Sequence, residues 1–439
     1  MTEQHKVHSY PVTPQDRMNY LLGVYSAVQQ IGIVLKFSGQ LDTDLLKQVL
    51  QLMLKKYPIL SCRFVEDEIP YWDRFTGRIE ESILNVKFCT TSEEAIMLKA
   101  HLAEPMEWIT GPMVQATLFR SVCDVLCIKI SHLCSDAAGL KEYTHLLASL
   151  YTRLYKKEPY ERIEKELLGE EVGFRDQGPL FAAAGITDIS SFPLQEPGTA
   201  SLWSFPSTLD NHAPAITTQT LDREQMIGLI SITKANGATV NDGLLASYFR
   251  SIAKQAIYME PRTIEKAIGI TVDLRRYLPN RTTGNLCNLS AMEMPAIEMD
   301  ENESFKTTLQ KVKRAMDIIK ENKPGLSSAV GMEKMASMPL SSAKAMLGTQ
   351  VEMAKQTRMA LPLLTNLGVI SDSSIYFGDV EAEEGYMTAP IMYSPFFSVG
   401  ASTYQNVLTL SVGYHTPAVS KQAVSRLLDD MISEFTTNA

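Results

Sequence analysis

The segment spanning residues 124–151 contains the residue types that proton-transfer chemistry requires. It begins DVLCIKISHLCSDAAG, so that an apolar run is followed by His132 and, four residues later, by Asp136. An imidazole with an ordinary pKa of roughly 6.5 can take up a proton at physiological pH and return it. The spacing alone has a high false-positive rate, and Asp136 would equally suit the N-cap of a following helix. His132 is therefore a candidate general base, and the structural elements around it decide whether it can act as one.

The elements predicted on either side of His132 would hold it in a defined place. The apolar run 124–131 predicts a strand, and apolar residues at helical spacing predict a helix over 137–156. The end of a strand is a rigid platform for a catalytic side chain. The small residues Ala137 and Gly139 permit close approach of the backbone. These features suit a catalytic site, whereas a lone histidine at a strand end is more often a hydrogen-bonded core or turn residue, and the local pattern leaves both interpretations open.

Cys134 offers a different chemistry at the same place. Residues 132 and 134 of an extended segment point to the same side, so the thiol could form an acyl-enzyme with His132 as its base. A reactive thiol needs a cationic neighbour that lowers its pKa, and the sequence shows none nearby. The nucleophilic role of Cys134 is therefore the weaker alternative.

Across the whole chain, helical and strand patterns alternate in two comparable halves. The periodicity predicts helices over 13–29, 42–57, 92–104, 222–235, 239–257, 303–322, 418–436 and a methionine-rich stretch over 327–360. Residues 173–215 are rich in Gly, Pro and Ser and lack periodicity, which is typical of a crossover. We expect an α/β (α+β) fold with an N-terminal subdomain over 1–177, a linker over 178–214 and a C-terminal subdomain over 215–439. Ligands usually bind in the cleft between such halves.

Composition narrows the function classes. The 439 residues are 45% apolar and 21% charged with a net charge of −9, which disfavours a nucleic-acid partner. No apolar run is long enough to span a membrane and the first residues lack an apolar signal, so we expect a cytoplasmic protein without membrane contact. The six cysteines are irregularly spaced without a CxxC pair, and we expect no metal site.

Six segments together resemble the chloramphenicol acetyltransferase and condensation-domain superfamily, which includes alcohol acetyltransferases. SHLCSDAAG resembles its HHxxxDG signature, with Ser131 in place of the first histidine and Ala137 in place of the glycine. The other segments follow in the family's order: LKKYPILSCRF at 54–64, ATVNDGLLASYFRSIA at 238–253, TVDLRRYLP at 271–279, GNLCNLSAM at 284–292 and TNLGVI at 365–370. The resemblance therefore spans nearly the whole chain.

The resemblance implies a fold and a set of roles. The two halves would be chloramphenicol-acetyltransferase-like subdomains that form a V-shaped pseudo-dimer with an interfacial tunnel. His132 would be the general base, and Asp136 would be a structural aspartate paired with Arg275 of the V-D-L-R segment. Residues expected to line the cleft are Ser131, Cys134, Ala137, Gly139, Thr365 and Asn366.

The resemblance also implies an activity. We expect an acyltransferase that moves an acyl group from acyl-CoA to a small alcohol or amine, with no permanently bound cofactor. One alternative is a free-standing condensation enzyme of the nonribosomal peptide type, which would use phosphopantetheine thioesters on an acyl carrier protein. Ser131 and Ala137 keep open a second alternative, a degenerate binding protein of the same fold. With both halves in one chain, a monomer would suffice.

Overall fold

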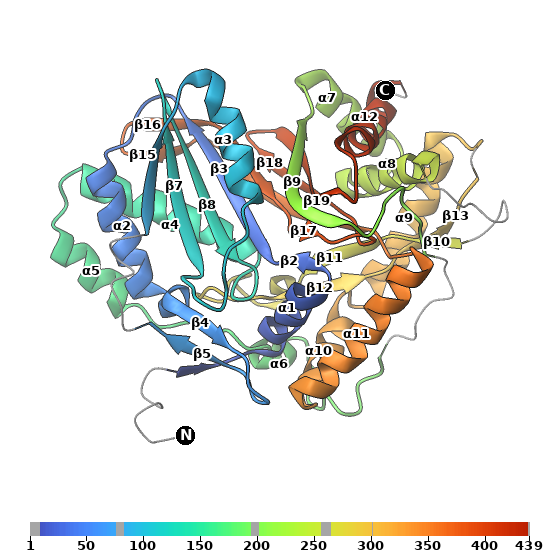
Figure 1. Cartoon of the computed structure of the whole chain (residues 1–439), viewed down its shortest axis with the longest axis horizontal. Coiled ribbons are helices and arrows are strands. Elements are labelled where there is room, and N and C mark those ends of the chain that lie inside the picture. Colours follow the sequence, from blue (N-terminus) through green and yellow to red (C-terminus); the bar gives the residue numbers. More distant parts are fainter. Residues whose placement is uncertain (1–8, 76–82, 195–201, 256–264, 301, 438–439) are drawn as a thin grey trace.

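Two large mixed sheets, each covered by helices, dominate the computed structural model, which describes residues 9–75, 83–194, 202–255, 265–300 and 302–437 (Figure 1). Residues 195–201 of the predicted crossover and 256–257 of the predicted helix 239–257 lie outside the described residues. The mixed α/β class expected from the sequence is confirmed.

The first sheet contains the strand that leads to His132. Its strands, in spatial order, are β15 (Ile375–Phe377), β16 (Val380–Thr388), β3 (Gln30–Phe37), β8 (Asp124–Ser131), β7 (Val114–Arg120) and β6 (Leu84–Phe88). Every residue of β8 is buried. A strand that is covered on both faces reads as a continuous apolar run, which is why its pattern is not alternating.

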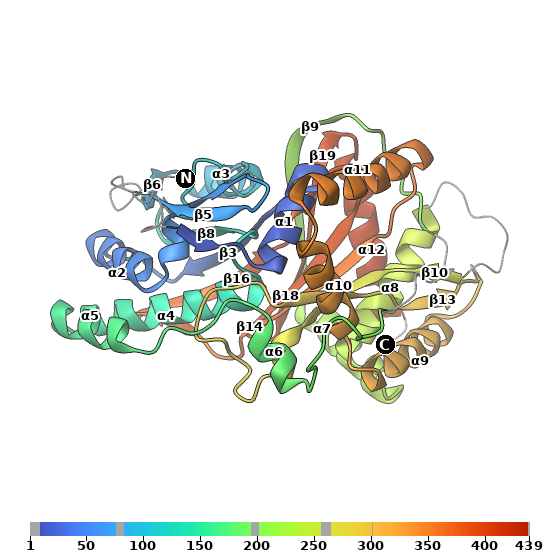
Figure 2. The same cartoon turned by 90° about the horizontal axis from the view of Figure 1, so that it is seen from below.

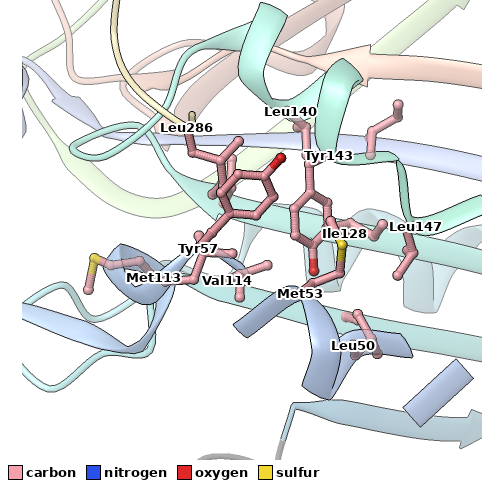
Figure 3. Packing of buried hydrophobic residues seen from close by; sticks show 14 of the residues in the cluster. Leu50, Met53, Tyr57, Met113, Val114, Ile128, Leu140, Tyr143, Leu147 and Leu286 are labelled. Atoms are coloured by element: carbon pink, nitrogen blue, oxygen red, sulfur yellow. The ribbon is translucent and has the colours of Figure 1, made fainter. Parts of the chain in front are cut away.

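Helices cover both faces of this sheet. Helices α2 (Thr43–Lys56), α4 (Ala137–Tyr155) and α5 (Tyr160–Gly169) pack on one face, and α3 (Thr91–Ala103) packs on the other. Figure 3 shows the apolar contacts between Leu50 and Met53 of α2 and Tyr143 and Leu147 of α4. Asp42 caps α2 by accepting hydrogen bonds from two backbone N–H groups, as a capping aspartate does.

The second sheet is built mostly from the C-terminal half of the chain. Its path is β12 (Ser290–Glu293), β11 (Gly269–Asp273), β14 (Leu363–Ser371), β18 (Ser398–Tyr404), β19 (Val407–Pro417), β17 (Ile391–Met392) and β2 (Ala27–Val28), with β9 (Asn211–Thr220) also paired to β19. Helices α7 (Arg223–Ala235), α8 (Val240–Gln255), α9 (Phe305–Glu321) and α12 (Lys421–Thr437) share a second apolar core with it.

Smaller elements fill the space around the two sheets. They comprise β1 (Ser9–Pro11), β5 (Tyr71–Arg74) and β4 (Cys62–Val65) in one sheet, β10 (Glu265–Ala267) with β13 (Ala296–Glu298) in another, the helices α1 (Pro14–Tyr25), α6 (Gly178–Ala183), α10 (Leu326–Ala336) and α11 (Leu340–Thr357), and short 3-10 turns at Pro58–Ser61 and Leu274–Tyr277. Helix α1 lies beside α10 and α11 (Figure 2), and its Arg17 donates hydrogen bonds to the carbonyls of Ala336 and Met338.

Several elements differ from the sequence prediction. Helix α1 ends at Tyr25, so that β2 lies within the range predicted as the helix 13–29. Helix α6 lies within the predicted linker. The methionine-rich stretch is two helices rather than one, because Pro339 ends the first pattern and precedes α11. Strand β9 begins at Asn211, within the predicted linker, because its edge pairing with β19 extends further than its apolar residues do. Helix α5 was not predicted. The subdomain boundaries at residues 177 and 214 stay a prediction.

The described part of the chain holds no helix that is both long and apolar enough to cross a membrane.

Candidate active site

His132 lies where the two large sheets meet. It directly follows β8 of the first sheet, and its backbone N–H donates to the carbonyl of Gln29 at 2.9 Å. Gln29 is the single residue between β2 of the second sheet and β3 of the first. The end of β8 therefore places the imidazole at the junction of both halves.

The imidazole is held in one orientation and one tautomer. Its Nδ1 lies 2.9 Å from the carbonyl oxygen of Ser135. A carbonyl only accepts, so Nδ1 carries the proton and Nε2 carries the lone pair. Burial lowers the pKa of His132 below its ordinary value of 6.5, although the Asp136 carboxylate opposes this shift. The ring is therefore a neutral base at physiological pH.

Both carboxylate oxygens of Asp136 accept hydrogen bonds that hold the local structure. It is the N-cap of α4, and its Oδ1 accepts from the backbone N–H of Gly139 at 3.0 Å. Its Oδ2 accepts from the N–H of Leu289 at 2.8 Å and from Nη1 of Arg275, also at 2.8 Å. The expected ion pair between Asp136 and Arg275 is thus present, and it joins the His132 turn to the second half of the chain.

Both partners of this pair are shielded from solvent. Arg275 is only 2% exposed. Burial alone would raise the pKa of Asp136, but the charge of Arg275 and the hydrogen bonds hold that pKa below its ordinary value. Gly139 is required by the packing, since a Cβ there would lie 2.3 Å from the Ser135 hydroxyl oxygen.

The structure places Ser131 and Cys134 in the interior rather than on an exposed wall. Ser131 is 1% exposed and Cys134 is fully buried, with its Sγ donating to the carbonyl of Ser131 at 3.3 Å. Burial raises the pKa of the Cys134 thiol well above its ordinary value, which disfavours a thiolate nucleophile. Gly139 is also buried, and Ala137 is half-buried at the first position of α4.

Thr365 and Asn366 lie on β14 of the second sheet. Asn366 is exposed, its Nδ2 donates to Oδ1 of Asn241 at 3.2 Å, and its Oδ1 accepts from the N–H of Gly368. Among the described contacts, no hydrogen bond joins either residue to His132. Their role in lining the cleft stays a prediction.

Two further residues hold the His132 turn, and the sequence did not single them out. Nδ2 of Asn288 donates to the carbonyls of His132 and Leu133, each at 3.0 Å. Nη2 of Arg175 donates to the carbonyl of Cys134 at 3.0 Å. Asn288 lies inside the GNLCNLSAM segment, and its place in that motif was the only sequence feature that could have indicated it. Arg175 lies in the segment interpreted as a crossover, where no sequence feature indicated a role for it.

Two surface pockets lie away from the imidazole. One, of about 520 Å³, is lined by residues at the start of α1, in the connection between α10 and α11 and in the β4–β5 hairpin, among them Arg17 and Glu68. The other, of about 460 Å³, is lined by Tyr57, Glu142, Thr282 and neighbouring residues. Neither pocket is lined by His132, so the interfacial tunnel stays a prediction.

The described residues contain no group of three or more His, Cys, Asp or Glu placed to bind a metal ion.

Comparison with known proteins agrees with this fold. Residues 7–166 match the model of the Condensation domain family. No curated protein matches the sequence. Among solved structures, the chain is similar to the first condensation domain of the calcium-dependent antibiotic synthetase in complex with a substrate analogue, with a TM-score of 0.67 and 15% identity over 98% of this chain and 96% of that one.

Two further structures are similar over a comparable length. TRI3, the trichothecene 15-O-acetyltransferase from Fusarium sporotrichioides, has a TM-score of 0.69 and 11% identity, covering 98% of this chain and 95% of that one. Polyketide synthase associated protein 5 from Mycobacterium tuberculosis has a TM-score of 0.65 and 12% identity, covering 98% and 100%.

The fold is that of a two-subdomain protein of the chloramphenicol acetyltransferase-like type. The family match and these structures confirm the resemblance to the condensation-domain superfamily that the sequence motifs indicated.

Proposed function

We propose that this protein is an acyltransferase that moves an acyl group from a thioester to a hydroxyl or amine, with Nε2 of His132 as general base. The observation that carries the proposal is the 2.9 Å contact between Nδ1 of His132 and the Ser135 carbonyl. It leaves the lone pair on Nε2 of a ring that burial keeps neutral. The fold shared with an acetyltransferase and a condensation domain supports the reaction class.

The chemistry needs no covalent enzyme intermediate. Nε2 of His132 accepts the proton of the acceptor hydroxyl or amine as its oxygen or nitrogen attacks the thioester carbonyl. The carbon–sulfur bond then breaks, and the imidazolium returns the proton to the departing thiolate. The buried Cys134 thiol takes no part in these reaction steps, which agrees with its raised pKa.

We propose acyl-CoA as the donor and a small alcohol or amine as the acceptor, with CoA as a co-substrate rather than a bound cofactor. The similarity to an O-acetyltransferase supports this choice. The match of residues 7–166 to the Condensation domain family favours a second candidate, in which the donor thioester is carried on the phosphopantetheine of an acyl carrier protein.

A donor screen tests the proposal. The purified protein is incubated with acyl-CoA thioesters of increasing chain length, or with the same acyl groups on a carrier protein, together with alcohols and amines. Release of free thiol that depends on both the acceptor and His132 supports acyl transfer, and the donor that is consumed identifies the candidate. If no donor of either kind is consumed, acyl transfer is wrong and the non-catalytic binding alternative gains.

A further inference from the structure

Side chains donate hydrogen bonds to four successive backbone carbonyls of the turn that carries His132. Residues 132–135 form this turn, between the end of β8 and the N-cap of α4. The donors are Nδ2 of Asn288 to the carbonyls of residues 132 and 133, Nη2 of Arg175 to that of residue 134, and Nδ1 of His132 to that of residue 135. All four distances lie between 2.9 and 3.0 Å. The turn is therefore held by side chains from distant parts of the chain.

Asp16 of α1 orients both donors. Its Oδ1 accepts from Nη2 of Arg175 at 3.2 Å. It also lies 3.3 Å from Nδ2 of Asn288, whose two N–H groups serve three acceptors, so that one N–H is shared between Asp16 and a carbonyl of the turn. Its Oδ2 accepts from Nε1 of Trp72 at 3.1 Å. Asp16 has no exposed side-chain surface, and Asn288 is fully buried. Nε of Arg175 also donates to the carbonyl of Leu286 at 2.8 Å, so the guanidinium is fixed on three sides.

These contacts set where the Ser135 carbonyl lies. Side-chain donors on the carbonyls of residues 132–134 restrain the backbone that leads to the Ser135 carbonyl. The planar guanidinium presents its N–H groups in a rigid fork, so it fixes geometry as well as charge. Hydrogen bonds in a water-poor interior are strong enough to hold this arrangement. The acceptor of the imidazole proton is thereby fixed.

We propose that Arg175 and Asn288, oriented by Asp16, are positioning residues for His132 that hold the Ser135 carbonyl where it selects the Nδ1–H tautomer and leaves Nε2 as the base. This inference rests on the function proposed for His132 and deepens it. Asn288 also interacts with the His132 side chain, and this interaction raises the pKa of the imidazole against the effect of burial. Both residues act through His132 and its turn, so they are positioning residues rather than catalytic ones. A purely structural role would lower stability and leave the tautomer unchanged.

The first test compares Asn288→Ala with the matched control Asn285→Ala. Asn285 lies three residues earlier and donates to the carbonyl of Gly173, away from the His132 turn. We expect Asn288→Ala to lower kcat by about 10- to 100-fold with a smaller change in KM, since misplacing a catalytic group costs rate more than binding. We expect Asn285→Ala to stay within about threefold of the natural protein, because it leaves the positioned turn intact.

The second test separates charge from geometry. Arg175→Lys keeps a cation beside Asp16, but a single ammonium lacks the fork that reaches Cys134 and Leu286 together. If Arg175 only neutralises Asp16, the lysine variant retains full activity and the proposal fails. We expect it to fold and to lose about as much kcat as Asn288→Ala.

A readout without turnover keeps this inference separate from the proposed function. In protein labelled with isotopic nitrogen at histidine, the two imidazole nitrogen shifts report which nitrogen carries the proton, and His132→Gln assigns the His132 signals. We expect the Nδ1–H form in the natural protein and a mixture of tautomers in folded Asn288→Ala and Arg175→Lys. This result supports the inference even if no thioester is ever consumed. An unchanged tautomer in both folded variants overturns it, even if His132 proves to be the base.

Discussion

At the scale of single residues, the environment of His132 makes a prediction about pH. Burial lowers its pKa below 6.5, so the neutral form that the proposed base requires persists to lower pH than in a free imidazole. We expect kcat/KM to stay constant from about pH 8 downward and to fall only below pH 6.5, as His132 becomes protonated. A pH–rate profile of the free enzyme measures this, and an acid limb centred above pH 7 would contradict it.

The buried ion pair predicts a large effect on stability. Arg275→Met leaves the Asp136 carboxylate buried without its cation, which should lower the free energy of unfolding by about 3–5 kcal/mol. The double variant Asp136→Asn with Arg275→Met removes both charges and should be less destabilised than the single variant. Urea unfolding compares them. A loss below about 1 kcal/mol in Arg275→Met would show that the pair is not a principal tie between the halves.

The sequence could predict some site residues and not others. His132 and Asp136 stand together in one segment, and Arg275 lies in a motif that resembles the family's. Arg175 and Asn288 act through backbone carbonyls of residues far away in the sequence. Every residue has a backbone carbonyl, so a hydrogen bond from a side chain to a carbonyl places no requirement on the type of the accepting residue. No local sequence pattern could therefore reveal these contacts.

At the scale of elements, Lys129 of β8 ties the sheet to the end of α3. Its Nζ donates to the carbonyls of His101 and Glu104, at 2.9 and 2.8 Å, as cations do at helix C-termini. Lys129 is 1% exposed, and burial lowers its pKa to about 8. The charged form is therefore present below pH 8 at a cost in desolvation.

This buried lysine predicts how stability varies with alkaline pH. The folded pKa of about 8 lies below the unfolded value of 10.5, so between these values the unfolded chain binds more protons. The free energy of unfolding should therefore rise with pH over this interval, relative to Lys129→Met, which lacks the titrating group. Chemical denaturation of both proteins from pH 7.5 to 10 gives the two slopes. Parallel curves would contradict the lowered pKa.

Elements with strong local signals were predicted closely, and those set by tertiary pairing were not. Helix α2 has a capping aspartate and a clear apolar face, and it begins and ends within one residue of the prediction. Strand β9 begins at Asn211, inside the predicted linker over 178–214, because a polar stretch with Pro214 gains its order from pairing with β19. Pro339 marks the break in the sequence, but methionines that recur on both sides of it favoured one continuous helix.

At the scale of the whole molecule, the two halves exchange strands. β15 and β16 come from the C-terminal half and complete the first sheet beside β3, while β2 comes from the N-terminal half and joins the second. The motif order predicted two halves, but this exchange could not be predicted, because strand order in a sheet depends on pairing partners far apart in sequence.

Strand exchange predicts cooperative unfolding. Neither sheet is complete without residues of the other half, so the loss of one sheet exposes an edge of the other. We expect a single unfolding transition in which far-ultraviolet and near-ultraviolet circular dichroism coincide. Two separate transitions would show that the halves are independent folding units.

The most direct measurement of the central claim is the rate of acyl transfer by His132→Gln beside the control His145→Gln. His145 lies on α4, and its Nε2 contacts the carbonyl of Ile370 rather than the site. With a donor and acceptor that the natural protein turns over, we predict that His132→Gln lowers kcat by about 10²–10⁴-fold while His145→Gln stays near the natural rate. Equal rates for the natural protein and a folded His132→Gln variant would contradict the account.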